Sequence, residues 1–190
     1  MVATYGLGAF TQDLDALVAD PARDQRAIVA AAKPLLARLL QDMSWLDRRC
    51  AAPRGKTVQY LLHQHPEDRY SVVAVVFDVG YCTSVHNHGT WGLVGVWHGE
   101  EQEERFTRSG DGARSGETRL RPAGSVVNTP GSVTHLIAPD EDVHRIRNLS
   151  PHPSRSIHVY GGDLNGKARE QYDLETGAIK EFRTSVVVLE

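Results

Sequence analysis

The stretch SVHNHGTWGLVGVWHG, residues 84–99, places two histidines inside a run that has the composition of a buried strand. Residues i and i+2 of a strand point to the same face, so His86 and His88 project together while Asn87 faces the other side. Inside a barrel the two imidazoles would converge on one point, where they could bind one divalent metal ion. The alternative is a pair of half-exposed polar residues on an ordinary strand.

The chain around this stretch has the texture of a β-protein from about residue 56 onward. Short runs rich in β-branched and aromatic residues alternate with turn residues, for example RYSVVAVVFDV (69–79) and VHRIRN (143–148). Many short strands at regular spacing predict a sandwich or barrel. We therefore expect a mainly β fold, with one domain over residues 1–190 and its β-barrel over residues 55–190.

The first fifty residues predict a helical layer packed on that barrel. Thr11 is a plausible N-cap, and Pro21 stands where a second helix could begin. Apolar residues at helical spacing follow, but Pro34 falls among them. Proline removes a backbone donor and clashes with the preceding turn, so we expect it to kink or divide that helix.

Composition excludes several classes of function. The 190 residues carry a formal net charge of −3, which gives no electrostatic footprint for nucleic acid or an anionic membrane. No apolar run is long enough to span a bilayer, and the N-terminus lacks the basic and apolar regions of a signal peptide. Two cysteines do not make a disulfide scaffold, so a reducing cytoplasm is the expected location.

A third metal ligand is suggested by resemblance to the cupin signature. That signature has HxH, a glutamate three or four residues later, and a distant histidine followed by x-x-x-Asn. Here Gly92 and Leu93 stand at the glutamate positions, whereas HRIRN (144–148) matches the distant half. The resemblance therefore implies a double-stranded β-helix barrel and favours His144 as the third ligand. His135, in PGSVTHLIAP, is the competitor.

A site of three neutral histidines without a carboxylate has a chemical consequence. The bound metal would keep its full charge and open coordination positions, and it would favour anionic ligands supplied by the substrate. Imidazoles suit iron, zinc, copper and nickel alike, so the ligand type alone does not choose the metal.

A second constellation lies in SIHVY, residues 156–160. Ser156, His158 and Tyr160 stand at i, i+2 and i+4, and so share one face of a strand. On an inward face, three such side chains could form a hydrogen-bonded relay that ends at the tyrosine hydroxyl. The alternative is an edge strand with a polar outer face.

These motifs in this order resemble the thiol dioxygenases, the cysteine dioxygenase family within the cupins, over about residues 55–175. The resemblance implies mononuclear non-haem Fe(II), one per chain, on His86, His88 and His144. It also implies that Ser156, His158 and Tyr160 form the catalytic triad beside the metal. The expected reaction is the oxidation of a small thiol carboxylate, 3-mercaptopropionate or L-cysteine, with O2 to its sulfinate. The expected partners are that thiol and O2, for a monomer or homodimer.

Two departures from the animal enzymes point to a bacterial, glutamine-type branch. Cys82 precedes HxH and is out of register, so no crosslink from a cysteine to the triad tyrosine is expected. The early strand TVQYLLHQ has no arginine to hold the substrate carboxylate, and Gln59 or Tyr60 occupies that place. That branch favours 3-mercaptopropionate and has its carboxylate-binding arginine shortly after the triad, which matches Arg169. Trp91 is expected to contribute an apolar wall.

Two other functions stay open at this point. One is a cupin with another metal, such as zinc or nickel, that acts as an isomerase or lyase. The other is a non-catalytic barrel that binds a small molecule. The latter requires the SIHVY face to point outward and His144 to lie far from His86.

Overall fold

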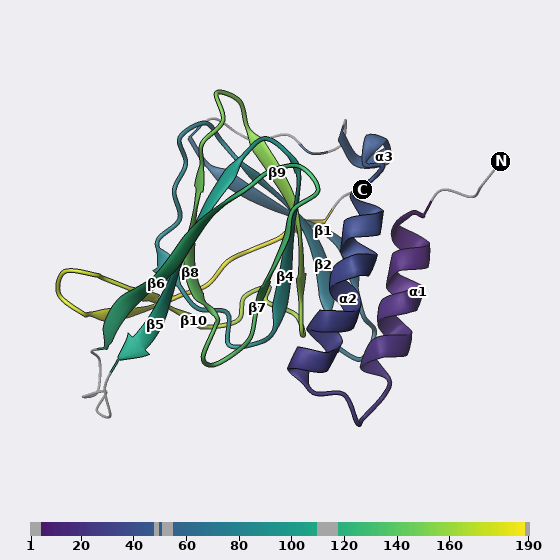
Figure 1. Ribbon diagram of the computed structural model, residues 1–190, viewed down its shortest axis with the longest axis horizontal. Helices are drawn as coiled ribbons and strands as arrows, with labels where there is room; N and C mark the ends of the chain where they lie inside the picture. Colours follow the sequence, from purple (N-terminus) through teal and green to yellow (C-terminus); the bar gives the residue numbers. More distant parts are fainter. Residues whose placement is uncertain (1–4, 48–49, 51–54, 110–117, 189–190) are drawn as a thin grey trace.

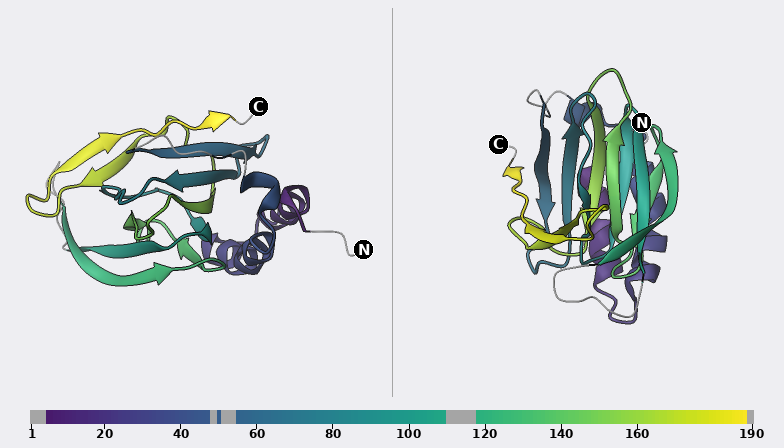
Figure 2. Two further views of the ribbon diagram at one scale, coloured as in Figure 1. Left: turned by 90° about the horizontal axis from the view of Figure 1, so that it is seen from above. Right: turned by 90° about the vertical axis from the view of Figure 1, so that its left-hand side faces the viewer.

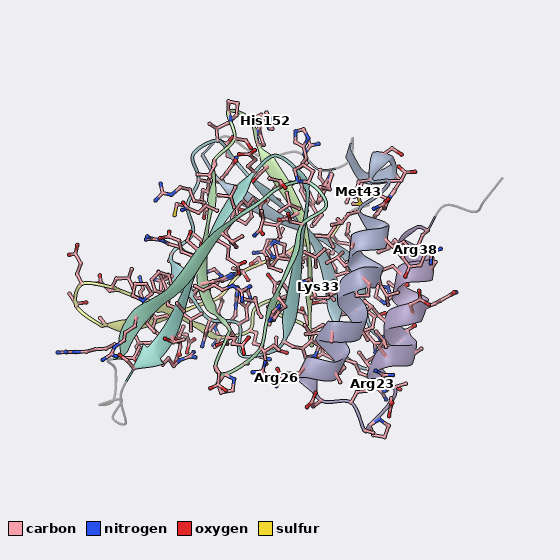
Figure 3. All side chains as sticks on the ribbon, viewed as in Figure 1. Arg23, Arg26, Lys33, Arg38, Met43 and His152 are labelled. Atoms are coloured by element: carbon pink, nitrogen blue, oxygen red, sulfur yellow. The ribbon has the colours of Figure 1, made fainter. Side chains whose placement is uncertain are left out.

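A computed structural model describes residues 5–47, 50, 55–109 and 118–188 of the chain. Three helices come first: α1 (Leu7–Val18), α2 (Gln25–Leu39) and the short α3 (Ser44–Asp47). The charged side chains Arg23, Arg26, Lys33 and Arg38 of this segment face solvent (Figure 3). None of the helices in the described part is long and apolar enough to cross a membrane. Residues 1–4 and 48–49 of the expected helical segment lie outside the described residues.

The helix boundaries differ from those expected. Thr11 lies inside α1, where its hydroxyl donates to the carbonyl of Gly8 at 3.0 Å, and so it is not the N-cap. The second helix begins after Asp24, whose carboxylate accepts from the amide of Ala27 at 2.8 Å, rather than at Pro21. Pro34 does not divide α2, which continues to Leu39. Burial of the apolar face of α2 outweighs the missing backbone hydrogen bond.

Twelve strands in the described residues form two six-stranded sheets that face each other (Figures 1 and 2). The first sheet contains, in spatial order, β12 (Val187–Val188), β1 (Thr57–Gln64), β2 (Ser71–Phe77), β9 (Ser154–Tyr160), β4 (Gly92–His98) and β7 (Val133–Leu136). The second sheet contains β11 (Ile179–Phe182), β10 (Arg169–Tyr172), β3 (Val85–His86), β8 (Val143–Asn148), β5 (Glu101–Ser109) and β6 (Arg119–Asn128). This arrangement of two facing sheets with an N-terminal helical layer confirms the expected mainly β fold.

The helices cover the outer face of the first sheet (Figure 1). There, alternate residues of β2 and β9 pack against Phe10, Leu14, Leu36 and Leu39 of the helices. A Cβ atom on Gly95 would lie 2.8 Å from the side chain of Leu40, which shows how closely the helical segment approaches β4. The other face of the first sheet points into the barrel, so β2 is buried along its whole length.

Candidate metal centre

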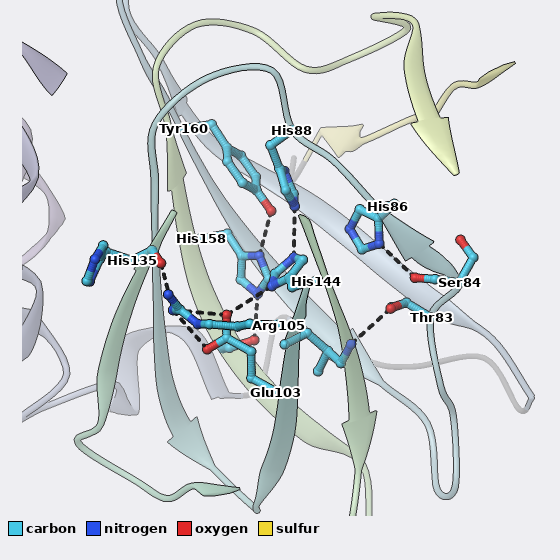
Figure 4. Close-up of polar contacts among 12 residues, drawn as sticks. Thr83, Ser84, His86, His88, Glu103, Arg105, His135, His144, His158 and Tyr160 are labelled. Atoms are coloured by element: carbon cyan, nitrogen blue, oxygen red, sulfur yellow. Dashed lines mark hydrogen bonds and ion pairs between the residues drawn. The ribbon is translucent and has the colours of Figure 1, made fainter. Parts of the chain in front are cut away.

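Three buried histidines converge inside the barrel (Figure 4). His86 ends β3 and pairs directly with His144 of β8, and His88 follows two residues after His86. One ring nitrogen of each histidine lies within 4.8 Å of the others. Strand pairing explains the convergence, because side chains of directly paired residues project on the same face of a sheet.

Hydrogen bonds turn two of the rings toward a common point. The Nδ1 atom of His86 donates to the carbonyl of Ser84 at 2.9 Å, and Nδ1 of His144 donates to Glu103 at 3.0 Å. Their Nε2 atoms are thereby left with a lone pair for a metal ion. Nε2 of His88 lies 2.9 Å from Nε2 of His144.

The electrostatics of two of the three rings, His86 and His88, favour metal binding over protonation. Burial, reinforced by the neighbouring histidines, holds the pKa of His86 and of His88 well below its ordinary value. The neutral imidazole is the form that binds metals. Three imidazole nitrogen donors in one buried cluster fit a divalent transition metal, and the set leaves coordination positions open.

His135 lies apart from this cluster, and its ring points away from it (Figure 4). Its Nε2 atom is 3.4 Å from the carboxylate of Glu141 on the surface, and only its backbone carbonyl reaches inward, where it accepts from Arg105 at 2.7 Å. The structure therefore brings His144, and not His135, to the HxH pair.

Sequence reasoning missed the carboxylate that holds His144. Glu103 on β5 is fully buried and accepts from His144, and Arg105 lies 3.1 Å from the same carboxylate oxygen. Burial opposes ionisation of Glu103, but the contacts with His144 and Arg105 outweigh it and lower the pKa of Glu103 to about 2. The signal was the alternation of Glu101, Glu103 and Arg105, which is unusual for a strand with buried positions.

A second missed carboxylate fixes the backbone of the HxH segment. Asp142, almost fully buried, accepts from the amides of His88 at 3.2 Å and Gly89 at 2.8 Å. Asn87 faces away from the metal ligands, as expected, and its side-chain amide donates to Glu170 at 3.1 Å. The segment is therefore held from both sides.

The three histidines form part of the wall of a cavity of about 240 Å³. Two members of the predicted relay, His158 and Tyr160, lie in the same wall. Ser156 Oγ is 2.9 Å from Nε2 of His158, and Nδ1 of His158 is 2.6 Å from the hydroxyl of Tyr160. The ring of Tyr160 also stacks on that of His88, with centroids 4.8 Å apart. The SIHVY face therefore points inward, and the outward-facing arrangement that a non-catalytic barrel required is wrong.

Arg169 and Gln59, two of the side chains expected to bind the substrate, both line the cavity. Arg169 is only 6% exposed and donates to Thr184 Oγ1 at 2.8 Å, and its guanidinium lies over the ring of Phe182. Burial lowers the pKa of Arg169, and among the described residues no carboxylate forms an ion pair with it. A buried cation without a carboxylate partner favours an anionic ligand.

Tyr60 and Trp91 do not line the cavity. Tyr60 is next to Gln59 on β1, so it points to the opposite face, where it packs against the core cluster beneath the helices. Trp91 lies in the same cluster, with its indole against Gly161. The expectation that these two side chains contact a substrate is therefore not supported by their positions.

Comparisons with known proteins give similarities to cupin structures. No protein-family model matches the chain. A protein from Thermus thermophilus is 19% identical over 62% of this chain and 93% of its own, with a TM-score of 0.47. A cupin superfamily protein from Desulfitobacterium hafniense is 16% identical over 60% of this chain and 84% of its own, with a TM-score of 0.42. An acetylacetone dioxygenase from Acinetobacter johnsonii is 15% identical over 72% of this chain and 80% of its own, with a TM-score of 0.43. At such identities the activities of these proteins are not transferred to this chain.

Proposed function

We propose that this protein is an Fe(II)-dependent thiol dioxygenase that oxidises a small thiol carboxylate with O2 to its sulfinate. The observation that carries the proposal is one cavity that combines three histidine ligands with a buried guanidinium, which forms no ion pair with a carboxylate among the described residues. A ligand set without a carboxylate matches a substrate that brings its own thiolate. Arg169 matches the carboxylate at the other end of that substrate.

The residues of the cavity have distinct parts in this proposal. His86, His88 and His144 would hold Fe(II), which supplies the redox chemistry that joins both atoms of O2 to the sulfur of a thiolate. Arg169 binds the substrate carboxylate, and Gln59 also lines the cavity. The Nη1 atom of Arg169 lies 3.4 Å from Nδ1 of His88, so the carboxylate site adjoins the metal site.

Tyr160 is the polar group placed to hydrogen-bond the reacting end of the substrate. Burial raises the pKa of the Tyr160 phenol above its ordinary value, so the hydroxyl keeps its proton. Burial also lowers the pKa of His158 to about 3, which keeps that imidazole neutral. The relay therefore orients a neutral hydroxyl and adds no charge to the cavity.

We propose 3-mercaptopropionate as a better substrate than L-cysteine. Cysteine would bind the metal through sulfur and nitrogen and would need its carboxylate held near β1. The two residues of β1 that line the cavity, Thr57 and Gln59, are both uncharged. A substrate without the amine can extend its carboxylate toward Arg169 instead.

The test is oxygen uptake by protein loaded in parallel with Fe(II), Zn(II) or Ni(II). The thiols are 3-mercaptopropionate, L-cysteine and cysteamine, which lacks the carboxylate. We expect uptake only with Fe(II), in the order 3-mercaptopropionate, cysteine, cysteamine. Uptake with none of the thiols, or an isomerase or lyase activity of the zinc or nickel form, would overturn the proposal.

The Arg169→Ala variant tests the carboxylate site. We expect a loss on the order of 2–4 kcal/mol in kcat/KM for 3-mercaptopropionate, the scale of losing a charged hydrogen-bonded pair in a closed site, and little change for cysteamine. Arg145→Ala is the matched control, because Arg145 pairs with Glu104 at 2.5 Å and does not line the cavity. A variant that loses activity equally on all three thiols would show that Arg169 acts on the metal ligands instead.

A further inference from the structure

Glu101 is a buried carboxyl group that the proposed reaction does not use. It lies two residues before Glu103 on β5, so both side chains point into the barrel. Its side chain is fully buried, and neither carboxylate oxygen has a hydrogen-bond partner of ordinary geometry among the described residues. Glu103, by contrast, contacts both His144 and Arg105. A buried carboxyl without a cationic partner requires an explanation.

The groups that face Glu101 belong to the strand that carries the relay. The hydroxyls of Ser154 and Ser156, both on β9, act to lower the pKa of Glu101 as nearby donors do, although neither forms a regular hydrogen bond with it in the structure. Ser156 is the first member of the relay that continues through His158 to Tyr160. Glu101 therefore lies beyond the Ser156 end of this hydrogen-bonded relay, and the Tyr160 hydroxyl in the cavity is the other end.

Each link of this chain can carry its hydrogen in either direction. The hydroxyl of Ser156 can donate to His158 or accept from it, and the same holds between His158 and Tyr160. Because His158 is neutral, it holds one proton, on one of its two ring nitrogens. The direction of donation along the whole relay is therefore set by the group that lies beyond Ser156.

We propose that Glu101 is a positioning residue whose protonation sets the direction in which the Tyr160 hydroxyl points its hydrogen. When Glu101 is protonated it donates to Ser156, which donates to Nε2 of His158. Nδ1–H of His158 then donates to the phenol oxygen, and the hydrogen of Tyr160 points into the cavity. When Glu101 is ionised it accepts from Ser156, every link reverses, and Tyr160 donates to His158. The two states differ by the one proton on Glu101, while Tyr160 and His158 stay neutral in both.

The charges around Glu101 place this change near neutrality. Burial raises the pKa of Glu101 to about 7, the negative charge of Glu103 on the same strand adds to the rise, and the two serine hydroxyls oppose it. The residues paired with Glu101 on the neighbouring strands are uncharged amides, Asn128 of β6 and Asn148 of β8. On the face of β9 that carries Ser154 and Ser156, the ionisable groups are His158 and Tyr160, both neutral, whereas Arg155 points to the opposite face. Below pH 7 the Tyr160 hydrogen therefore faces the substrate, and above it that hydrogen turns away.

The first test reads the two ends of the chain by infrared spectroscopy of the metal-free protein, so it does not depend on the proposed function. The wild type should show the carbonyl band of a protonated carboxylic acid below pH 7 and lose it above. The Tyr160 C–O band, assigned by its absence in Tyr160→Phe, should shift over the same range. Glu101→Gln should abolish both changes, because its amide donates to Ser156 at every pH, whereas Glu104→Gln on the outer surface should keep them.

Ser156→Ala separates this role from a merely structural one. It should preserve the titration of Glu101 and abolish the shift of the Tyr160 band, because the link between them is cut. A carboxylic acid band that is absent below pH 7, or a Tyr160 band that still shifts in Ser156→Ala or in Glu101→Gln, would overturn the proposal.

The second test deepens the proposed function and rests on it. The kcat of the iron-loaded wild type with 3-mercaptopropionate should fall as pH rises through about 7, by about tenfold per pH unit once Glu101 is ionised. Glu101→Gln should keep its rate on that alkaline side, and the difference between the two should vanish in the Tyr160→Phe background. The proposal would be overturned if kcat of Glu101→Gln fell at high pH as that of the wild type does. It would also be overturned if the difference in kcat between the two persisted in the Tyr160→Phe background.

Discussion

The two walls of the cavity stabilise their buried polar groups in different ways. On the second sheet, His144 is held by the ionised Glu103, which Arg105 holds in turn. On the first sheet, Ser156, His158 and Tyr160 form a chain of neutral hydrogen bonds. A charged contact fixes one geometry, because both partners depend on it. A neutral chain can reverse without leaving a buried charge unpaired.

Glu101 and Glu103 show this difference within one strand. They lie two residues apart and are equally buried, yet the pKa of Glu103 is lowered to about 2 and that of Glu101 is raised to about 7. The partners decide the sign: the guanidinium of Arg105 and the ring of His144 contact Glu103, whereas the groups near Glu101 in the described part of the chain are two hydroxyls and the negative charge of Glu103. Burial alone therefore does not determine the charge of a group.

The largest effect is expected on the second sheet, from loss of a metal ligand. Loss of a residue that only hydrogen-bonds a metal ligand typically weakens metal binding by about 10–100-fold. His144→Ala should weaken iron binding by more than this, because it removes a direct bond to the metal. Bound metal is measured after equilibrium dialysis. His135→Ala is the control and should bind normally, since its ring faces away. If His135→Ala lost its metal and His144→Ala kept it, the ligand assignment would be wrong.

A smaller effect is expected on the first sheet, where a change should affect rate and leave metal binding intact. Tyr160→Phe removes one positioned hydroxyl and no ligand, so turnover should fall by about 10²-fold with bound iron unchanged. The measurement pairs oxygen uptake with metal analysis of the same sample. Loss of iron in this variant would show that stacking on His88 matters more than the hydroxyl.

The smallest of the three effects tests the carboxylate behind His144. Glu103→Gln keeps an acceptor for Nδ1 of His144 but loses the charge, so iron affinity should fall by about tenfold. Glu104→Gln is the matched control, because Glu104 is on the same strand and pairs with Arg145 on the outer surface. Equal iron affinities for the two variants would mean that the charge of Glu103 behind His144 does not contribute to metal binding.

Strand alternation explains how much of this site could be predicted from the sequence. It placed His86 with His88, and Ser156 with His158 and Tyr160, and the structure keeps both groupings. The same alternation separates Gln59 from Tyr60, so only one of the two could face the cavity. The helix boundaries were less predictable, because the packing of α2 on the sheet overrides the local effect of Pro34.

The sequence by itself determined which side chains share a face, because a period of two residues is a property of each strand alone. Only the tertiary structure decided which faces meet. The pairing of β3 with β8 brings His144 to His86, and the pairing of β5 with β8 places Glu103 behind His144. These contacts join segments far apart in the chain, and their register is fixed when the two sheets bury their apolar faces together.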